Sequence, residues 1–97
     1  MNERNYIIIL YDYYGCLLSD KQKSCFEAYY FDNLTLSEIS ENEDVSRNAI
    51  HKMLKNIEKK LLWYEDNLHL CTKEKKIKAI LEKSNDDILK SEIEKLF

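Results

Sequence analysis

Apolar residues recur along most of the chain at the three- and four-residue spacing of amphipathic α-helices. The longest such pattern starts just after Ser46, where six apolar side chains follow one another at intervals of 4, 3, 4, 3 and 4: Ile50, Leu54, Ile57, Leu61, Tyr64 and Leu68. This heptad pattern predicts a long helix that continues past the edge of a small three-helix core. Its later half, with Trp63 beside it, therefore needs cover from the C-terminal segment or from a second copy of the protein.

Capping residues divide the chain before this helix into three shorter ones. A first helix over residues 5–14 should end at Gly15, because glycine takes a left-handed C-terminal conformation at no steric cost. Ser19 is a candidate N-cap for a second helix, which should end near residue 33. Thr35 and Glu38 have the spacing of a capping box, which predicts the start of a short third helix.

The C-terminal segment and the composition complete an all-α assignment. Thr72 is a candidate cap for a fifth helix, and residues 84–87 place two acids at the start of a sixth. The 97 residues include one glycine, no proline, one valine and two threonines, so the chain has few of the residues that build β-hairpins. The sequence predicts one all-helical domain over residues 1–97, with a helix-turn-helix core at about 19–60 and a C-terminal helical extension at about 72–97.

Residues 34–61 have the layout of a helix-turn-helix unit. Leu36 and Ile39 would form the inner face of its first helix, Val45 would fill the turn, and Ala49 and Ile50 would lie where the two helices pack. The side chains that should face outward are rich in hydrogen-bond donors and are the candidate site for nucleic acid or a partner protein: Ser46, Arg47, Asn48, His51, Lys52, Lys55 and Lys59. A small residue where the two helices pack and hydrogen-bond donors on the outer face are typical of a helix that enters a groove of nucleic acid.

Charge is segregated along the chain, although the formal net charge is only −3. Residues 46–60 carry five basic side chains and one acid, whereas residues 19–44 carry seven acids and two lysines. A basic helix can neutralise phosphates, but the acidic scaffold and a pI near 5.4 weaken non-specific attraction to nucleic acid. A solvated surface helix is the alternative interpretation of the same residues.

Seven tyrosines are the second unusual feature, and four of them lie in the first predicted helix among isoleucines and a leucine. A helix that is apolar on nearly all sides must be covered on nearly all sides, and tyrosine is favoured at subunit interfaces. An ordinary central helix is the alternative. We expect a homodimer, since a chain this short buries limited surface alone, with these residues at its interface: Tyr6, Leu10, Tyr11, Tyr14, Leu61, Trp63, Tyr64 and Leu68.

Little else in the sequence indicates chemistry. A Gly-rich phosphate loop is excluded by the single glycine, and no catalytic motif appears, so we expect no enzymatic activity and no cofactor. His69 and Cys71 lie two residues apart without further ligands nearby, so no metal site is predicted. The three cysteines lack C-x-x-C spacing, and the longest apolar run, residues 6–11, is far below the roughly 18 residues that span a bilayer. These features predict a soluble, cytoplasmic protein.

Four segments resemble the YlxM proteins of Gram-positive bacteria and mollicutes. They are LYDYYGCLLSDKQK at 10–23, FEAYY at 26–30, LTLSEIS at 34–40 and VSRNAI at 45–50, within a resemblance that covers roughly residues 6–68. The second half is also similar to region four of sigma factors. In the turn, where these proteins usually have a glycine, this chain has EDV at 43–45, and aspartate takes a left-handed conformation less readily than glycine.

The resemblance implies an all-helical, dimeric protein with a sigma-region-four-like helix-turn-helix. It further implies a non-enzymatic accessory or regulator of the signal recognition particle, with the particle's RNA or its GTPase as partner. The alternative is a DNA-binding transcriptional regulator that places the helix over residues 46–60 in the major groove, with Arg47 and Asn48 nearest the base edges. A third hypothesis is an interaction scaffold that uses the tyrosine-rich helix and no nucleic acid. Both nucleic-acid hypotheses require that the outward residues be exposed.

Overall fold

The computed structural model describes residues 4–96, and every regular element in that range is helical. The elements are α1 (Arg4–Tyr14), the short 3₁₀ helix η1 (Gly15–Leu17), α2 (Asp20–Tyr30), α3 (Leu36–Glu43), α4 (Arg47–Leu68), α5 (Leu70–Glu82) and α6 (Asp87–Glu94). The predicted all-α fold is confirmed. The long helix after Ser46 has the predicted extent, and 22 residues make it the longest element of the described range.

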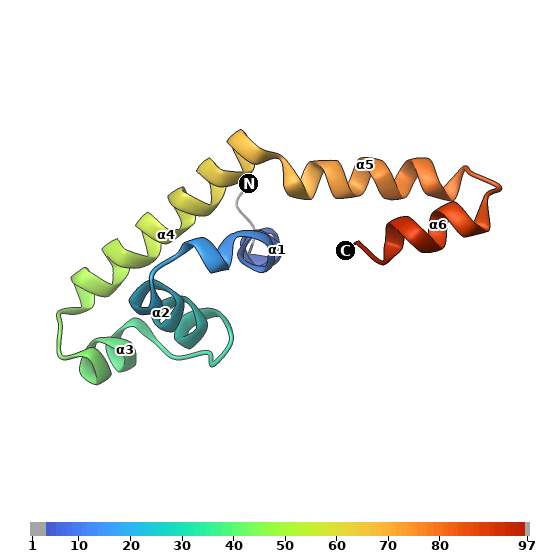
Figure 1. Ribbon diagram of the computed structural model, residues 1–97. Coiled ribbons are helices and arrows are strands. Elements are labelled where there is room, and N and C mark those ends of the chain that lie inside the picture. The colour runs from blue at the N-terminus through green and yellow to red at the C-terminus, as the bar shows by residue number, and fades with distance from the viewer. Residues whose placement is uncertain (1–3, 97) are drawn as a thin grey trace.

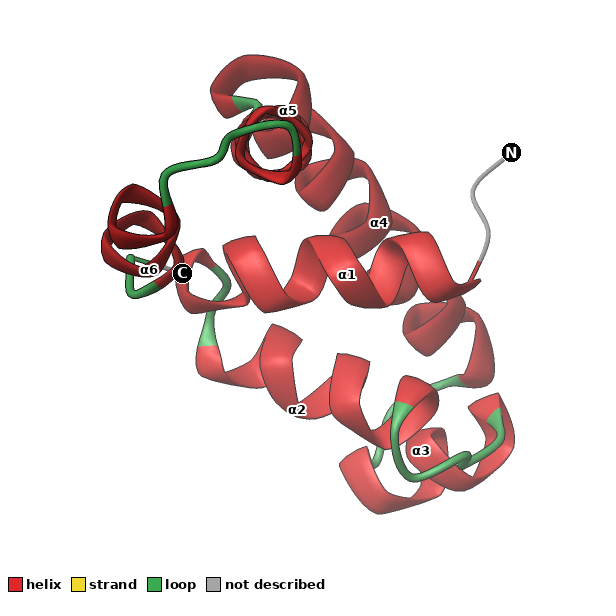
Figure 2. Cartoon of the chain, turned by 90° about the vertical axis from the view of Figure 1, so that its right-hand side faces the viewer, coloured by secondary structure: helices red, strands yellow, loops and turns green. Residues whose placement is uncertain are grey.

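The helices α1, α2 and α3 all pack against α4, and α1 lies beside α2 (Figure 2). The stacked rings of Tyr11 and Phe26, with centroids 4.0 Å apart, join α1 to α2. The chain turns sharply at the end of α4, so that α5 leads away from the three packed helices and α6 folds back along it (Figure 1). The resulting shape is elongated, at 55 × 23 × 22 Å. Its radius of gyration is 17.1 Å, against about 13 Å for a compact chain of this length.

Side-chain caps begin the helices where the sequence predicts them. The amide of Gln22 donates to the Ser19 hydroxyl (3.2 Å), and the amide of Glu38 donates to the Thr35 hydroxyl (3.1 Å). In both cases the third helical side chain accepts a hydrogen bond from the backbone of the cap, which completes a capping box. Each cap satisfies helix N–H groups that have no partner within the helix, so these helix starts were readable from short local motifs.

Three turns use left-handed backbone conformations at Asn33, Asp44 and His69, with φ between 54° and 57°. These are the residue types, other than glycine, that tolerate this region best. Gly15 is not among them, so the prediction of a left-handed glycine at the end of α1 is wrong. Space is tight there instead: an added Cβ would lie 3.1 Å from a ring carbon of Tyr11, so the ring would have to shift by a few tenths of an ångström.

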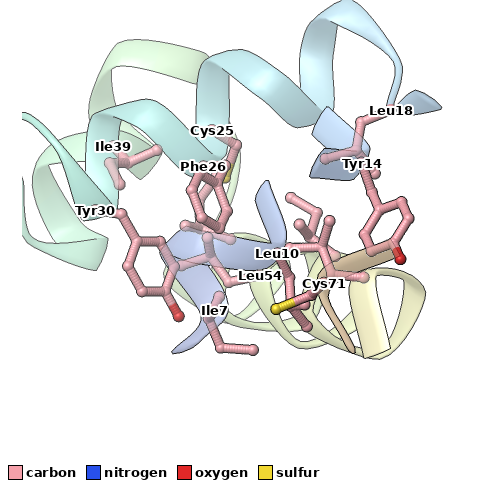
Figure 3. Packing of buried hydrophobic residues seen from close by; sticks show 13 residues of the cluster. Ile7, Leu10, Tyr14, Leu18, Cys25, Phe26, Tyr30, Ile39, Leu54 and Cys71 are labelled. Atoms are coloured by element: carbon pink, nitrogen blue, oxygen red, sulfur yellow. The ribbon is translucent and has the colours of Figure 1, made fainter. Parts of the chain in front are cut away.

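The core lies between α4 and the N-terminal helices, and its side chains come from α1, α2, α3, α4 and the first turn of α5 (Figure 3). Leu10, Tyr14 and Leu61 are 0% exposed. The structure therefore removes these three from the predicted dimer interface, because they have no surface left to offer a partner. Trp63 and Leu68 remain exposed, while the other three predicted interface residues are half-buried: Tyr6, Tyr11 and Tyr64.

The corner between α4 and α5 is built around the buried carboxylate of Glu65. Its Oε1 accepts hydrogen bonds from the Tyr14 hydroxyl (2.5 Å) and the Cys71 amide (3.1 Å). Its Oε2 accepts from the Thr72 amide (3.2 Å) and the Thr72 hydroxyl (2.8 Å). The prediction that Thr72 caps α5 is therefore wrong. Helix α5 begins at Leu70, whose amide donates to the Tyr14 hydroxyl (3.0 Å), and Glu65 accepts from the next two amides.

The C-terminal arm, α5 with α6, buries little. Leu81 is buried, but no residue of α6 is, and Ile80, which should point inward by its spacing, is 68% exposed. The apolar side chains of α6 are also at the surface, with Ile88 at 78% and Leu96 at 79% exposure. Trp63 is not covered by this arm.

Candidate nucleic-acid interface

The helices α3 and α4 form the helix-turn-helix, joined by a turn of three residues. Asp44 is left-handed (φ 54°, ψ 46°), and the amide of Val45 donates to the carbonyl oxygen of Ser40 (3.1 Å). This is the hydrogen bond of a Schellman motif, in which glycine usually takes the left-handed position. The turn thus closes with aspartate at that position, at some cost in backbone strain.

The first residues of α4 are oriented by a cap and by the core. The Ser46 hydroxyl accepts a hydrogen bond from the Ala49 amide (3.1 Å), which starts the helix, and Ile50, Leu54 and Ile57 are buried against the other helices. This fixes which side of α4 faces outward. All seven predicted site residues are exposed: Ser46, Arg47, Asn48, His51, Lys52, Lys55 and Lys59.

The N-terminal end of α4 suits an anion. A shallow depression at the surface is lined there by Ser46, Asn48, Ala49, His51 and Lys52. The first turn of α4 carries no acidic side chain, so the positive end of the helix dipole is not neutralised from within the helix. Backbone N–H groups at such an end, next to a lysine and a histidine, can hydrogen-bond a phosphate.

The lysines of the outer face are not equivalent. Lys55 lies 3.8 Å from the carboxylate of Glu58, which also accepts a hydrogen bond from the Tyr30 hydroxyl (3.1 Å). Among residues 4–96, Lys52 and Lys59 form no ion pair. They are seven residues apart, which places them about 20° apart around the helix. Lys52 and Lys59 therefore present unneutralised charge on one stripe, and Lys55 contributes less than the sequence alone indicated.

Two apolar residues of the turn region differ from expectation. Ala49 is exposed and Val45 is 40% exposed, so neither fills the contact between α3 and α4. Both line a small apolar cavity of about 180 Å³ together with Cys25, Ile50 and Met53. The buried apolar side chains next to the turn are instead Ile39 of α3 and Ile50 of α4.

Acidic side chains lie beside this basic face. Glu41, Glu43 and Asp44 are exposed at the end of α3, directly before α4. Hydrogen bonds from the backbone and the hydroxyl of Thr35 hold the pKa of Glu38 below its ordinary value, so this carboxylate stays charged as well. The field around the start of α4 is therefore mixed, which disfavours indiscriminate attraction of polyanions and leaves binding dependent on specific contacts.

The helix periodicity also places a residue that the sequence interpretation had assigned elsewhere. Trp63 is 60% exposed and follows Lys59 by four residues, so it lies on the outer face of α4 with the lysines. It does not share a face with Leu68, five residues later, which is about 140° around the helix. The four-residue spacing of Trp63 from Lys59 indicates this placement, provided that the buried face of α4 is known.

The described part of the chain narrows the remaining chemistry. In residues 4–96 no group of three or more His, Cys, Asp or Glu side chains is arranged to hold a metal ion. No helix in this range has both the length and the apolar content to cross a membrane.

Comparisons with known proteins agree with this architecture. The sequence profile of the UPF0122 family, described as "Putative helix-turn-helix protein, YlxM / p13 like", matches residues 1–96. A UPF0122 protein of Caldanaerobacter subterraneus subsp. tengcongensis is 42% identical over 86% of this chain and 71% of its own length. A UPF0122 protein of Clostridium novyi is 47% identical over 89% of this chain and 78% of its own length. One of Clostridium acetobutylicum is 39% identical over 100% of this chain and 77% of its own length.

Proposed function

The chain belongs to the UPF0122 family, and from the exposed basic face of its helix-turn-helix we propose that it is a non-enzymatic regulatory protein that binds nucleic acid through α4. The observation that carries this proposal is the pair Lys52 and Lys59, which are exposed, free of ion pairs within the described residues, and aligned along one stripe. Phosphate contacts from such a stripe supply affinity, and the start of α4 supplies the donors that reach bases.

The target proposed first is the signal recognition particle, through its RNA or its GTPase. Support for it comes from the resemblance to YlxM proteins, and the mixed charge around α4 fits a defined ribonucleoprotein surface better than bulk DNA. A cytoplasmic location is part of this proposal and agrees with the three free thiols of Cys16, Cys25 and Cys71.

The second candidate is a DNA-binding transcriptional regulator. It is favoured by one specific feature, the donor-rich first turn of α4 beyond the Ser46 cap, where Arg47 and Asn48 are both exposed. Recognition helices contact base edges with their N-terminal residues, and arginine pairs with guanine as asparagine pairs with adenine.

The test is a titration of the purified protein at low and at physiological salt against three targets: labelled duplex DNA, the particle's RNA, and the particle assembled with its GTPase. Tight binding to the particle with weak, salt-sensitive binding to duplex supports the first target. Salt-resistant binding to one particular duplex supports the second. Absence of binding to all three would refute a nucleic-acid function and leave the scaffold hypothesis.

Variants separate the roles of the residues. Lys52→Ala should weaken binding to all sequences alike and reduce the slope of log K against log salt by about 1, whereas Arg47→Ala should cost about 1–3 kcal/mol on a preferred sequence only. Lys76→Ala, an exposed lysine of α5, is the matched control and should change neither quantity. Equal effects of Lys52→Ala and Lys76→Ala would exclude α4 as the contact face.

A homodimer completes the proposal. Exposed apolar side chains extend from the end of α4 along the arm, and a second copy would bury them: Leu68, Leu70, Ile80, Ile88, Leu89 and Leu96. An apolar surface of this extent on a small chain is typical of an interface. Light scattering should give twice the chain mass, and Ile88→Glu should give the monomer. A monomeric wild-type protein at high concentration would refute the dimer.

A further inference from the structure

Trp63 stands out as a large aromatic side chain that the fold places in solvent. It is the only tryptophan of the chain and is 60% exposed, although it sits in a helix whose opposite face is fully buried. Leu61, two residues earlier, is 0% exposed. Two residues are about 200° around a helix, so the indole points away from the core.

The indole lies in line with the basic stripe of α4. Lys59 is four residues before it and Lys52 eleven, which corresponds to about 40° and 20° around the helix and to about 6 and 16 Å along it. Asn56, seven residues before Trp63, is also exposed and about 20° away. One outer surface thus combines two ammonium groups that form no ion pair within residues 4–96, an amide and a flat aromatic ring.

The neighbours of Trp63 contact it without covering it. Its ring meets the Tyr64 ring edge to face, with centroids 5.5 Å apart, and its backbone carbonyl oxygen accepts a hydrogen bond from the side-chain amide of Asn67 (2.8 Å). Asp66 is exposed one turn further on, whereas Lys59 lies one turn before the indole. Along α4 itself, a bound polyanion would therefore extend from Trp63 toward Lys59.

We propose that Trp63, with Lys59 and Lys52, forms a stacking site for an unpaired base of single-stranded nucleic acid. Bases stack on exposed aromatic side chains while lysines contact the flanking phosphates, and an amide such as that of Asn56 can hydrogen-bond a base edge. A base within a duplex is already stacked on both faces and cannot use the indole. The site rests on the proposed function and narrows its ligand from nucleic acid in general to a strand with an unpaired base.

The single tryptophan makes the test direct, because all indole fluorescence comes from Trp63. The full-length protein is titrated with a short adenine oligoribonucleotide, the same oligomer in DNA, an abasic strand of equal length and a duplex, with binding followed separately by anisotropy of the labelled strand. The single strands should quench the emission, whereas the abasic strand and the duplex should bind without quenching. Quenching by RNA alone identifies the strand as RNA, and quenching by both identifies the unpaired base whatever its sugar.

Substitution gives the second measurement. Trp63→Ala should weaken binding of the single strands by roughly 5- to 150-fold and leave the affinity for duplex unchanged. Trp63→Phe should restore part of the lost affinity for single strands. Leu17→Ala is the matched control, an exposed apolar side chain (48%) outside α4, and it should change no affinity. Circular dichroism of each variant checks the fold, which removal of an exposed ring should leave intact.

Three results would overturn the stacking site. Single strands that bind without quenching and with equal affinity to Trp63→Ala would refute it while the proposed function stands. Wild-type protein that binds no nucleic acid at all would refute both together. Indole emission of the wild type that shifts with protein concentration in the absence of nucleic acid, together with a Trp63→Ala variant that is monomeric, would show that a second copy covers the indole instead.

Discussion

Replacement of Glu65 by glutamine isolates the interaction that sets the direction of α5. The side chain is 5% exposed and joins α4 to α1 and α5 through four hydrogen bonds, all of which it accepts. Glutamine has the same shape but presents an NH₂ group in place of one oxygen. Whichever way the glutamine amide is oriented, its NH₂ group replaces one oxygen of Glu65 and meets the two donors that this oxygen served.

The size of the effect follows from this count. Hydrogen bonds to a charged group contribute about 1.5–3 kcal/mol each, and buried donors without an acceptor cost about 1–3 kcal/mol. The hydroxyls of Tyr14 and Thr72 can rotate and recover part of the loss, whereas the backbone amides of Cys71 and Thr72 cannot. We expect Glu65→Gln to lower the free energy of unfolding by about 2–4 kcal/mol, which for a domain of this size shifts Tm by about 10–20 °C.

The assay is urea denaturation followed by circular dichroism at neutral and at acidic pH. Burial alone would raise the pKa of Glu65, but the hydrogen bonds from Tyr14, Thr72 and Cys71 outweigh it and hold the pKa below its ordinary value of 4.5. A carboxylate with a depressed pKa in the folded state stabilises above its unfolded pKa, and this contribution is lost as pH falls through the folded pKa. The difference between wild type and Glu65→Gln should therefore shrink below about pH 4.5.

The control is Glu92→Gln, which alters an exposed surface pair with Lys95 (3.6 Å) and should change stability by less than about 0.5 kcal/mol. If Glu65→Gln and Glu92→Gln unfold at the same urea concentration at neutral pH, the Glu65 hydrogen bonds do not hold the α4–α5 corner and the reasoning fails.

Two further predictions concern the turn and the tyrosines. Asp44→Gly should raise the free energy of unfolding by about 0.5–1 kcal/mol, because glycine takes the left-handed conformation without strain. The control Asp66→Gly, within α4, should lower the free energy of unfolding by a similar amount. Thermal melts in which both variants lose stability would contradict this prediction. Burial and a carboxylate partner raise the pKa of Tyr14 and of Tyr30 from 10.0 to about 12. Since a raised tyrosine pKa favours the folded state while the hydroxyl is protonated, stability should fall between about pH 10 and pH 12, and Tyr30→Phe should flatten this decline in alkaline denaturation curves.

The helices of this protein could be read from the sequence because their signals are local. Ser19, Thr35 and Ser46 each cap a helix through an amide three residues later, and such a motif acts within one turn. The heptad spacing through Ile50, Leu54 and Ile57 likewise identified the buried face of α4. Once that face is known, the exposed site residues follow by elimination, so their exposure was predictable too.

Interactions across the chain were not readable in this way. Glu65 looks like any acidic residue of an exposed helix, yet it is buried and accepts hydrogen bonds both from Tyr14, 51 residues away, and from the first turn of α5. The ion pair of Glu58 with Lys55 is local, three residues apart in α4, but the hydrogen bond that Glu58 accepts from Tyr30 of α2 is not. Partnership of this kind depends on where other elements pack, which spacing does not encode.

The division is clearest at the predicted dimer interface. The sequence by itself determined that the tyrosine-rich first helix needs cover on nearly all sides, and that the apolar seam of the long fourth helix needs cover along its whole length. Only the tertiary structure decided what supplies this cover: Leu10, Tyr14 and Leu61 are buried in one core within the chain, whereas Trp63 and Leu68 of α4 stay exposed. Hydrophobicity is not directional, so a pattern states how much surface must leave water but not which surface it meets.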